Sequence, residues 1–187
     1  MINFSHSINS LKIVKIFFLT FFIGIGGVLF YATTRPDSFR VERSVDIKAP
    51  AAKIFPYVND LRKSVEWSPW EKADSQMKRT YTGPMVGKGA GYVWEGNREA
   101  GKGRMSITES TLNQRVTVAL HFDEPMVGDN IVEYILTPKG EYTTVTWAMS
   151  GPMAYVSKVI GLFMDMDKMI GGQFEKGLQS LKAVAEK

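Results

Sequence analysis

The longest hydrophobic segment of the chain covers residues 16–34 and carries no charge (IFFLTFFIGIGGVLFYATT). Its phenylalanine, leucine and isoleucine residues would occupy every side of a helix, which disfavours an amphipathic core helix. As a helix the segment would be about 29 Å long, close to the thickness of the bilayer's hydrocarbon core. The apolar part of a cleavable signal peptide is shorter, about 7–15 residues, and the segment ends in YATTRP (31–36), which is a poor cleavage signal. We therefore expect a single-pass transmembrane anchor at 16–34, between a short tail (1–15) and a polar linker (35–40).

The basic residues that flank this segment bear on its orientation. Lys12 and Lys15 precede it, whereas Arg35 and Arg40 follow it and are partly offset by Asp37. Cytoplasmic loops carry the excess of Lys and Arg, and here the two sides are nearly balanced. The short basic N-terminus favours an N-in anchor with the domain on the outer side of the membrane.

The rest of the chain, residues 41–187, has the patterns of one mixed α and β domain. Alternation of apolar and polar residues predicts a first strand at 39–47, which Ala49-Pro50 ends. Two short helices are expected at 51–58 and 60–66, before the Trp67-Ser68-Pro69-Trp70 turn. Further strands of an antiparallel meander are predicted at 77–82, 90–95, 101–109, 114–122, 130–137 and 142–149. Helical spacing from 154 to 185 predicts one long C-terminal helix, with a possible kink at Gly171-Gly172.

Strand alternation predicts which side chains face the core. His121, Glu95 and Arg104 have the opposite parity to their apolar neighbours and should face solvent. For Glu133 both faces remain open, because either Val132 and Tyr134 or Ile131 and Ile135 could point inward. The predicted inward set comprises Tyr92, Trp94, Met105, Ile107, Val116, Val118, Leu120, Phe122, Val145, Trp147 and Met149.

Several motifs of this domain resemble those of one known superfamily. The segment VDIKAPAAKIF (45–55) is similar to the "I-x-A-P-x-x-x-I-F" entry from strand to helix, and WSPWE (67–71) to the segment after the first helix. GKGAGYVWEGN (87–97) resembles the G-x-G central strand, and GKGRM (101–105) and the run 163–181 continue the likeness. Together they resemble the START-like (SRPBCC) superfamily, in particular its polyketide cyclase/dehydrase-like branch, over about residues 41–187. The implied fold is α+β: a helix-grip fold whose curved antiparallel sheet wraps around a long C-terminal helix.

The resemblance also implies a pocket for a hydrophobic molecule between the sheet and the C-terminal helix. Aromatic and methionine side chains suit apolar ligands of variable shape. A solid core made of the same residues is the alternative interpretation. The residues expected to line or border the pocket are Trp67, Trp70, Tyr92, Trp94, Met105, Trp147, Met149, Phe163 and Met166.

Charge and composition narrow the possible functions. The net charge is +4, but residues 1–40 hold four basic residues against one acidic, so the domain itself is nearly neutral. A nucleic-acid partner is therefore not expected, while anionic lipid head groups could meet the charge beside the anchor. The chain has no cysteine, which excludes disulfides, thiolate catalysis and cysteine-based metal sites. With His121 as the one histidine of the domain, we expect neither a metal nor a cofactor.

Three functions are compatible with these features. The first is a membrane-anchored domain that binds a hydrophobic small molecule or lipid. The second is an enzyme of the polyketide cyclase/dehydrase type, which needs an ionisable residue that faces the pocket; the sequence identifies none. The third is a regulatory domain that binds a protein partner.

Overall fold

The computed structural model describes residues 4–187, with side chains from residue 14 onward. The chain forms two compact units. One contains the residues up to Asp37 together with Met153–Met164, and the other contains Ser38–Pro152 and Asp165–Lys187. Each unit is described separately below.

The first unit is built on helix α1 (Phe4–Thr33), which begins well before the apolar run. Residues 4–15, expected to be a tail, are therefore part of the same helix. The stretch Val14–Thr33 is long and apolar enough to cross a membrane, a property that a signal sequence near the N-terminus shares. The short helix α4 (Tyr155–Ile160) completes the unit and packs on the C-terminal end of α1, where Ala32 is fully buried.

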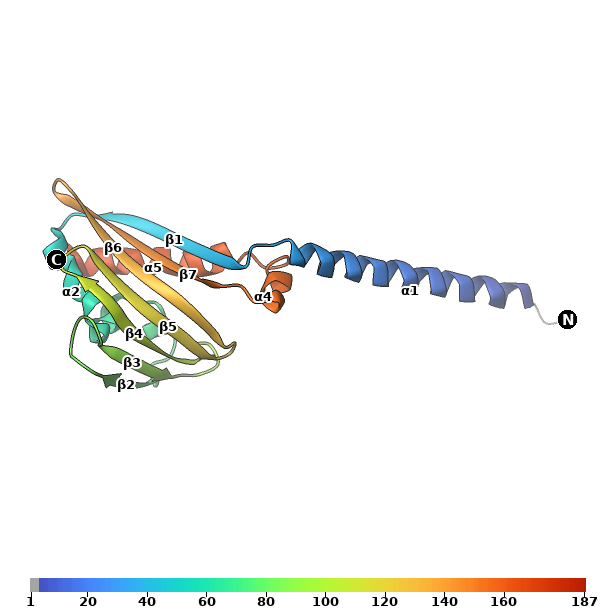
Figure 1. Ribbon diagram of the computed structural model, residues 1–187, viewed down its shortest axis with the longest axis horizontal. Helices are drawn as coiled ribbons and strands as arrows, with labels where there is room; N and C mark the ends of the chain where they lie inside the picture. Colours follow the sequence, from blue (N-terminus) through green and yellow to red (C-terminus); the bar gives the residue numbers. More distant parts are fainter. Residues whose placement is uncertain (1–3) are drawn as a thin grey trace. The chain divides into compact units, whose positions relative to one another are not determined.

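The second unit is an antiparallel sheet with helices on one face (Figure 1). Its strands are β1 (Ser38–Ile47), β2 (Lys78–Thr82), β3 (Gly91–Glu95), β4 (Lys102–Thr111), β5 (Arg115–Glu124), β6 (Gly128–Lys139) and β7 (Tyr142–Pro152). The spatial order is β1-β7-β6-β5-β4-β3-β2, so the meander of β2 to β7 is closed by the first strand pairing with the last. This confirms the α+β helix-grip prediction.

The helices of this unit come from two parts of the chain. After β1 come α2 (Ala51–Asn59), the 3₁₀ turn η1 (Leu61–Lys63), α3 (Ser64–Trp67) and a second 3₁₀ turn, η2 (Trp70–Lys72). The C-terminal helix is α5 (Met166–Ala185), which contacts β1, β7 and α3. Figure 1 shows it running along the sheet beside β7.

The prediction of one long helix from 154 to 185 is wrong. The segment forms α4 and α5, separated by residues 161–165. Asp165 is the N-cap of α5, and its carboxylate accepts a hydrogen bond from the Lys168 backbone N–H at 3.0 Å. A capped start satisfies an amide that would otherwise lack a partner, so a new helix begins there. Gly171 and Gly172 lie inside α5 and do not end it.

The core lies between the sheet and the helices, as strand alternation predicts. Val116, Val118 and Leu120 of β5 are buried, and so are Val145 and Trp147 of β7. They belong to one apolar core with a stripe of α5 at helical spacing, namely Phe174, Leu178 and Leu181, all at most 1% exposed.

The structure also answers the question that Glu133 left open. Its carboxylate lies 2.9 Å from Nη1 of Arg40 and 3.7 Å from Nη1 of Arg115, on the outer face of the sheet. Its neighbours Val132 and Tyr134 point to the other face, toward the helices. Glu133 is therefore a surface ion-pair residue.

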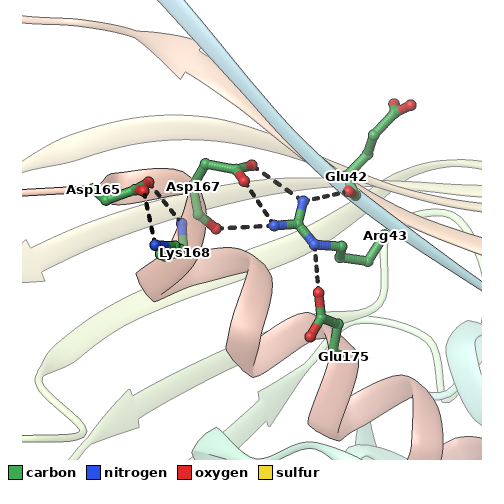
Figure 2. A network of polar contacts seen from close by, with 6 residues as sticks. All are labelled: Glu42, Arg43, Asp165, Asp167, Lys168 and Glu175. Carbon is green, nitrogen blue, oxygen red and sulfur yellow. Dashed lines mark hydrogen bonds and ion pairs between the residues drawn. The ribbon is translucent and has the colours of Figure 1, made fainter.

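Arg43 of β1 ties the sheet to the start of α5 (Figure 2). Its Nε donates to Glu175 at 2.7 Å, its Nη2 donates to the Asp167 carboxylate at 2.7 Å, and its Nη1 donates to the Glu42 carbonyl at 2.8 Å. The bond to Arg43 lowers the pKa of Asp167, and the bonds to Asp167 and Glu175 raise the pKa of Arg43. The guanidinium lies so close to Gly171 that a Cβ there would collide with it. Gly171 therefore permits a contact that any other residue would obstruct.

This geometry predicts a coupling between Gly171 and Arg43. Alanine is favoured over glycine by about 1 kcal/mol inside a helix. Gly172→Ala, where the added Cβ meets nothing within 4 Å, should give most of that gain in free energy of unfolding. In the natural chain, the gain in free energy of unfolding from Gly171→Ala should be about 1 kcal/mol smaller than that from Gly172→Ala. In an Arg43→Ala background, Gly171→Ala should give the same gain as Gly172→Ala gives. Chemical denaturation of the four single and double variants in detergent tests this. Equal gains at both glycines with Arg43 present would contradict it.

Candidate ligand-binding cavity

A cavity of about 270 Å³ lies in the second unit, between the sheet, the α2–η2 segment and α5. Strands β3 to β7 supply one wall, and Ile170 and Phe174 of α5 supply part of the other. This is close to the lower end of the usual range for small-molecule pockets, about 300–1,000 Å³. It is also larger than a cavity of about 150 Å³ that suffices for benzene. The core of this domain is therefore hollow rather than solid.

Aromatic rings form the wall around Trp147. Phe174 stacks on it with 4.4 Å between ring centroids, and Trp67 and Trp70 meet it edge to face at 5.1 and 5.4 Å. Tyr134 adds a fourth ring at 5.4 Å. Such pairs are stabilising beyond their buried area, so each ring of this wall helps to hold its neighbours in place.

The indole nitrogens of the two buried tryptophans of this wall differ in their hydrogen bonds. Trp67 Nε1 donates to the Tyr57 carbonyl at 3.0 Å. Trp147 Nε1 has no partner, and among the described side chains it is the one buried nitrogen or oxygen in that state. An unpaired buried donor costs free energy, so this group is notable in a wall that borders a cavity.

Glu71 is the main polar group of the cavity. It lies in η2, and the turn at Ser68-Pro69 directs it inward, where its side chain is 6% exposed. Its Oε1 accepts from the Tyr92 hydroxyl at 2.8 Å and lies 3.1 Å from the Ser64 hydroxyl. Its Oε2 accepts from Arg79 Nε at 2.8 Å.

This arrangement changes the proton affinities of its neighbours. The hydrogen bond to Glu71 raises the pKa of Arg79. Burial raises the pKa of Tyr92, and the Glu71 charge raises it further. Burial alone raises the pKa of Tyr134, which borders the same cavity. Both tyrosines therefore keep their protons and remain hydrogen-bond donors near neutral pH.

Most of the residues predicted from the sequence come together here. The cavity is lined by Trp67, Trp70, Tyr92, Trp94, Met105, Trp147 and Met149. Phe163 and Met166 are not among its lining residues. Phe163 belongs to the 153–164 segment of the first unit and is 74% exposed, and Met166 at the first turn of α5 is 37% exposed. Their predicted place assumed one continuous helix, and the break at 161–165 changes the helical phase.

His121, Glu95 and Arg104 lie outside the cavity, on the outer face, as their parity predicts. His121 Nδ1 is 2.6 Å from Asp129 and its Nε2 is 3.3 Å from Asp123. Glu95 pairs with Lys78 and Arg104 with Asp123. Within the described residues, no group of three or more His, Asp or Glu side chains could hold a metal ion.

Sequence reasoning missed Glu71 and Tyr134. Glu71 follows the WSPW segment directly, but its direction depends on a short 3₁₀ turn whose side chains have no regular alternation. Tyr134 was detectable: it shares strand parity with Val132 and Leu136, both of which are buried.

A curved antiparallel sheet that encloses a cavity against a C-terminal helix defines the class of helix-grip domains. Residues 38–186 match the family model described as "Polyketide cyclase / dehydrase and lipid transport". The chain therefore belongs to the polyketide cyclase/dehydrase and lipid transport family. No curated protein matches the sequence significantly.

Solved structures show the same fold. Protein CV1439 from Chromobacterium violaceum is 15% identical, with a TM-score of 0.56 over 82% of this chain and 99% of that one. The Aha1 dimer from Colwellia psychrerythraea is 16% identical, with a TM-score of 0.56 over 79% and 96%. DynU16, a putative protein in the dynemicin biosynthetic locus, is 19% identical, with a TM-score of 0.56 over 82% of this chain and 48% of that one. At these identities the likeness concerns the fold alone.

Proposed function

We propose that this protein binds a hydrophobic small molecule or lipid in the cavity of its helix-grip domain. The observation that carries the proposal is the preformed, mainly apolar cavity beside the Trp147 wall. Burial of apolar ligand surface contributes roughly 25 cal/mol per Å², and the few polar groups orient the ligand. The seven sequence-predicted lining residues are the proposed binding residues.

A substitution that fills the cavity tests this function. Met105→Trp should weaken uptake of the neutral dye N-phenyl-1-naphthylamine about tenfold or more, because the larger ring occupies ligand space. Dye fluorescence and native mass spectrometry of the full chain in detergent measure it. Met126→Trp is the matched control, because Met126 is 52% exposed and does not line the cavity. Failure of the unsubstituted chain to take up the dye, or equal uptake by both variants, would contradict the proposal.

We also propose that α1 anchors the domain in the membrane as a single span, with the domain on the outer side. The support is the length and apolar character of Val14–Thr33, of which only 6% is buried in protein. Resistance to carbonate extraction tests the anchor, and protease digestion of intact cells tests the side. A chain released by carbonate would contradict the anchor.

An enzyme of the cyclase type is the second candidate, favoured by Glu71 at the cavity wall. Its carboxylate would take a proton from a carbon between two carbonyls of the substrate. The resulting enolate carbon would attack a third, more distant carbonyl of the same substrate to form a carbon–carbon bond, and Glu71 would return the proton to the new alkoxide. Cyclisation of a poly-β-carbonyl compound that is lost in Glu71→Gln would support this reaction. An unchanged rate in that variant would exclude Glu71 as its base.

A further inference from the structure

The charged groups at the cavity are all of one sign. Asp60 and Glu71 line it, and among the described residues no Lys, Arg or His does. Each carboxylate has one ion-pair partner among the described residues, and both partners are already engaged. Arg62 Nη1 lies 3.7 Å from Asp60 and donates to the Met85 carbonyl at 2.8 Å. Glu71 pairs with Arg79. Its Nη1 donates to the Met77 carbonyl at 2.7 Å, its Nη2 to the Glu71 carbonyl at 3.2 Å, and its Nε to the Glu71 carboxylate.

Glu71 nevertheless keeps room for one more donor. Oε1 already accepts a hydrogen bond from the Tyr92 hydroxyl and lies close to the Ser64 hydroxyl. Among the described residues, Oε2 accepts a hydrogen bond from Arg79 alone. A carboxylate oxygen accepts about two hydrogen bonds, so one acceptor position of Oε2 is free. A ligand hydroxyl near it would donate its proton to a charged acceptor, which gives a strong hydrogen bond.

We propose that the cavity selects uncharged apolar ligands that carry a hydroxyl or phenol group, and that it discriminates against carboxylates such as free fatty acids. This inference rests on the proposed ligand-binding function. A fatty-acid carboxylate would lose its hydration inside an apolar wall, find no free cation and face two carboxylates whose own cations are already engaged. An alcohol of the same length avoids all three penalties and satisfies Oε2.

Two ligands of equal chain length test the selection. The full chain in detergent is loaded with N-phenyl-1-naphthylamine at pH 8 and titrated with 1-decanol or with decanoate. We expect decanol to displace the dye at a concentration at least tenfold lower than decanoate does. Methyl decanoate, neutral but without a donor, should fall between them and so separates the effect of charge from that of the hydrogen bond.

Glu71→Gln is the decisive variant, because it removes the charge and keeps an acceptor oxygen. The ratio of decanoate to decanol concentrations should fall at least threefold in this variant. Comparing that ratio between the two chains cancels the unequal partition of the ligands into detergent. Asp60→Asn, at the second carboxylate, should lower the ratio in the same direction and serves if Glu71→Gln does not fold.

The outcomes separate this inference from the function on which it rests. If the dye binds and decanoate competes as well as decanol, the ligand selection is wrong and the binding function stands. The same conclusion follows if neither variant changes the ratio. If the unsubstituted chain takes up no dye, the binding function fails, and the selection fails with it.

A second, independent observation concerns the first unit. Its segment Met153–Met164 exposes several large apolar side chains, with Val156 at 61%, Phe163 at 74% and Met164 at 45% exposure. The one charged residue of the segment, Lys158, is 8% exposed and forms an ion pair with Asp37. The segment therefore presents an uncharged apolar surface.

This surface is fixed to the C-terminal end of α1. The Tyr155 hydroxyl donates to the Leu29 carbonyl at 2.8 Å, within the last turns of that helix. The Met153 N–H donates to the Asp37 carbonyl at 2.7 Å, and the Lys158–Asp37 ion pair closes the same junction. The segment therefore stays next to the C-terminal end of α1.

The geometry points to Met153–Met164 as a second membrane-contacting segment that rests in the interfacial layer of the lipid. This rests on the proposed anchor. Apolar side chains next to a span gain free energy by entering the boundary between head groups and acyl chains.

The absence of cysteine from the chain makes a clean labelling test possible. Single variants Phe163→Cys, Leu112→Cys and Ile23→Cys are labelled with the fluorophore NBD and placed in phosphatidylcholine vesicles. The label at 163 should emit at shorter wavelength than that at 112, which is 72% exposed in the second unit, and should be quenched by spin-labelled lipid. If the label at 163 emits and is quenched like the label at 112, while the label at 23 lies in the lipid, the segment does not contact the membrane. If the label at 23 also emits and is quenched like the label at 112, α1 is not a membrane anchor.

Discussion

Replacing Phe174 with alanine is expected to lower the free energy of unfolding by about 3–5 kcal/mol. Phe174 is 1% exposed, stacks on Trp147 and borders the cavity. Its removal loses the burial of a whole ring and joins the vacated space to a cavity that exists already. Because the surrounding rings hold one another in place, little collapse can compensate. Urea denaturation of the full chain in detergent measures the loss.

Leu112→Ala is the control for this substitution. Leu112 is 72% exposed in the β4–β5 turn, so its truncation should change the free energy of unfolding by no more than about 0.5 kcal/mol. A loss below about 1.5 kcal/mol in Phe174→Ala would mean that the aromatic wall relaxes. The cavity would then not be the rigid, preformed site that the proposed function requires.

The strands were predictable because their signal is local. In β5 and β7, apolar residues alternate with polar ones, and a period of two leaves a single choice of buried face. That choice placed Trp147 and Met149 on the cavity side and His121 on the outer side. The cavity itself was not derivable from periodicity, because alternation is the same for a solid and for a hollow core. The family resemblance supplied that expectation.

Two features depended on interactions that periodicity does not register. The break before α5 comes from one cap, Asp165, in a segment whose apolar spacing continues through it. The inward direction of Glu71 comes from a single 3₁₀ turn and from partners on β2 and β3, Arg79 and Tyr92. A lone acidic residue after WSPW is typical of an exposed turn, and only the partners, 8 and 21 residues further along the chain, change that interpretation.

Arg79→Met should have an effect as large as that of Phe174→Ala, for an electrostatic reason. Methionine keeps much of the side-chain volume but leaves the Glu71 carboxylate, 6% exposed, without its cation. Breaking a buried ion pair from one side costs about 3–5 kcal/mol, because the remaining charge stays desolvated. The double variant Glu71→Gln, Arg79→Met should recover most of that loss, since no unpaired charge remains. Arg104→Met is the matched control: its pair with Asp123 is about half exposed on both sides and should contribute less than about 1 kcal/mol. If denaturation shows Arg79→Met to be as mild as Arg104→Met, Glu71 is solvated through the cavity, and its charge is too well screened to repel a carboxylate ligand.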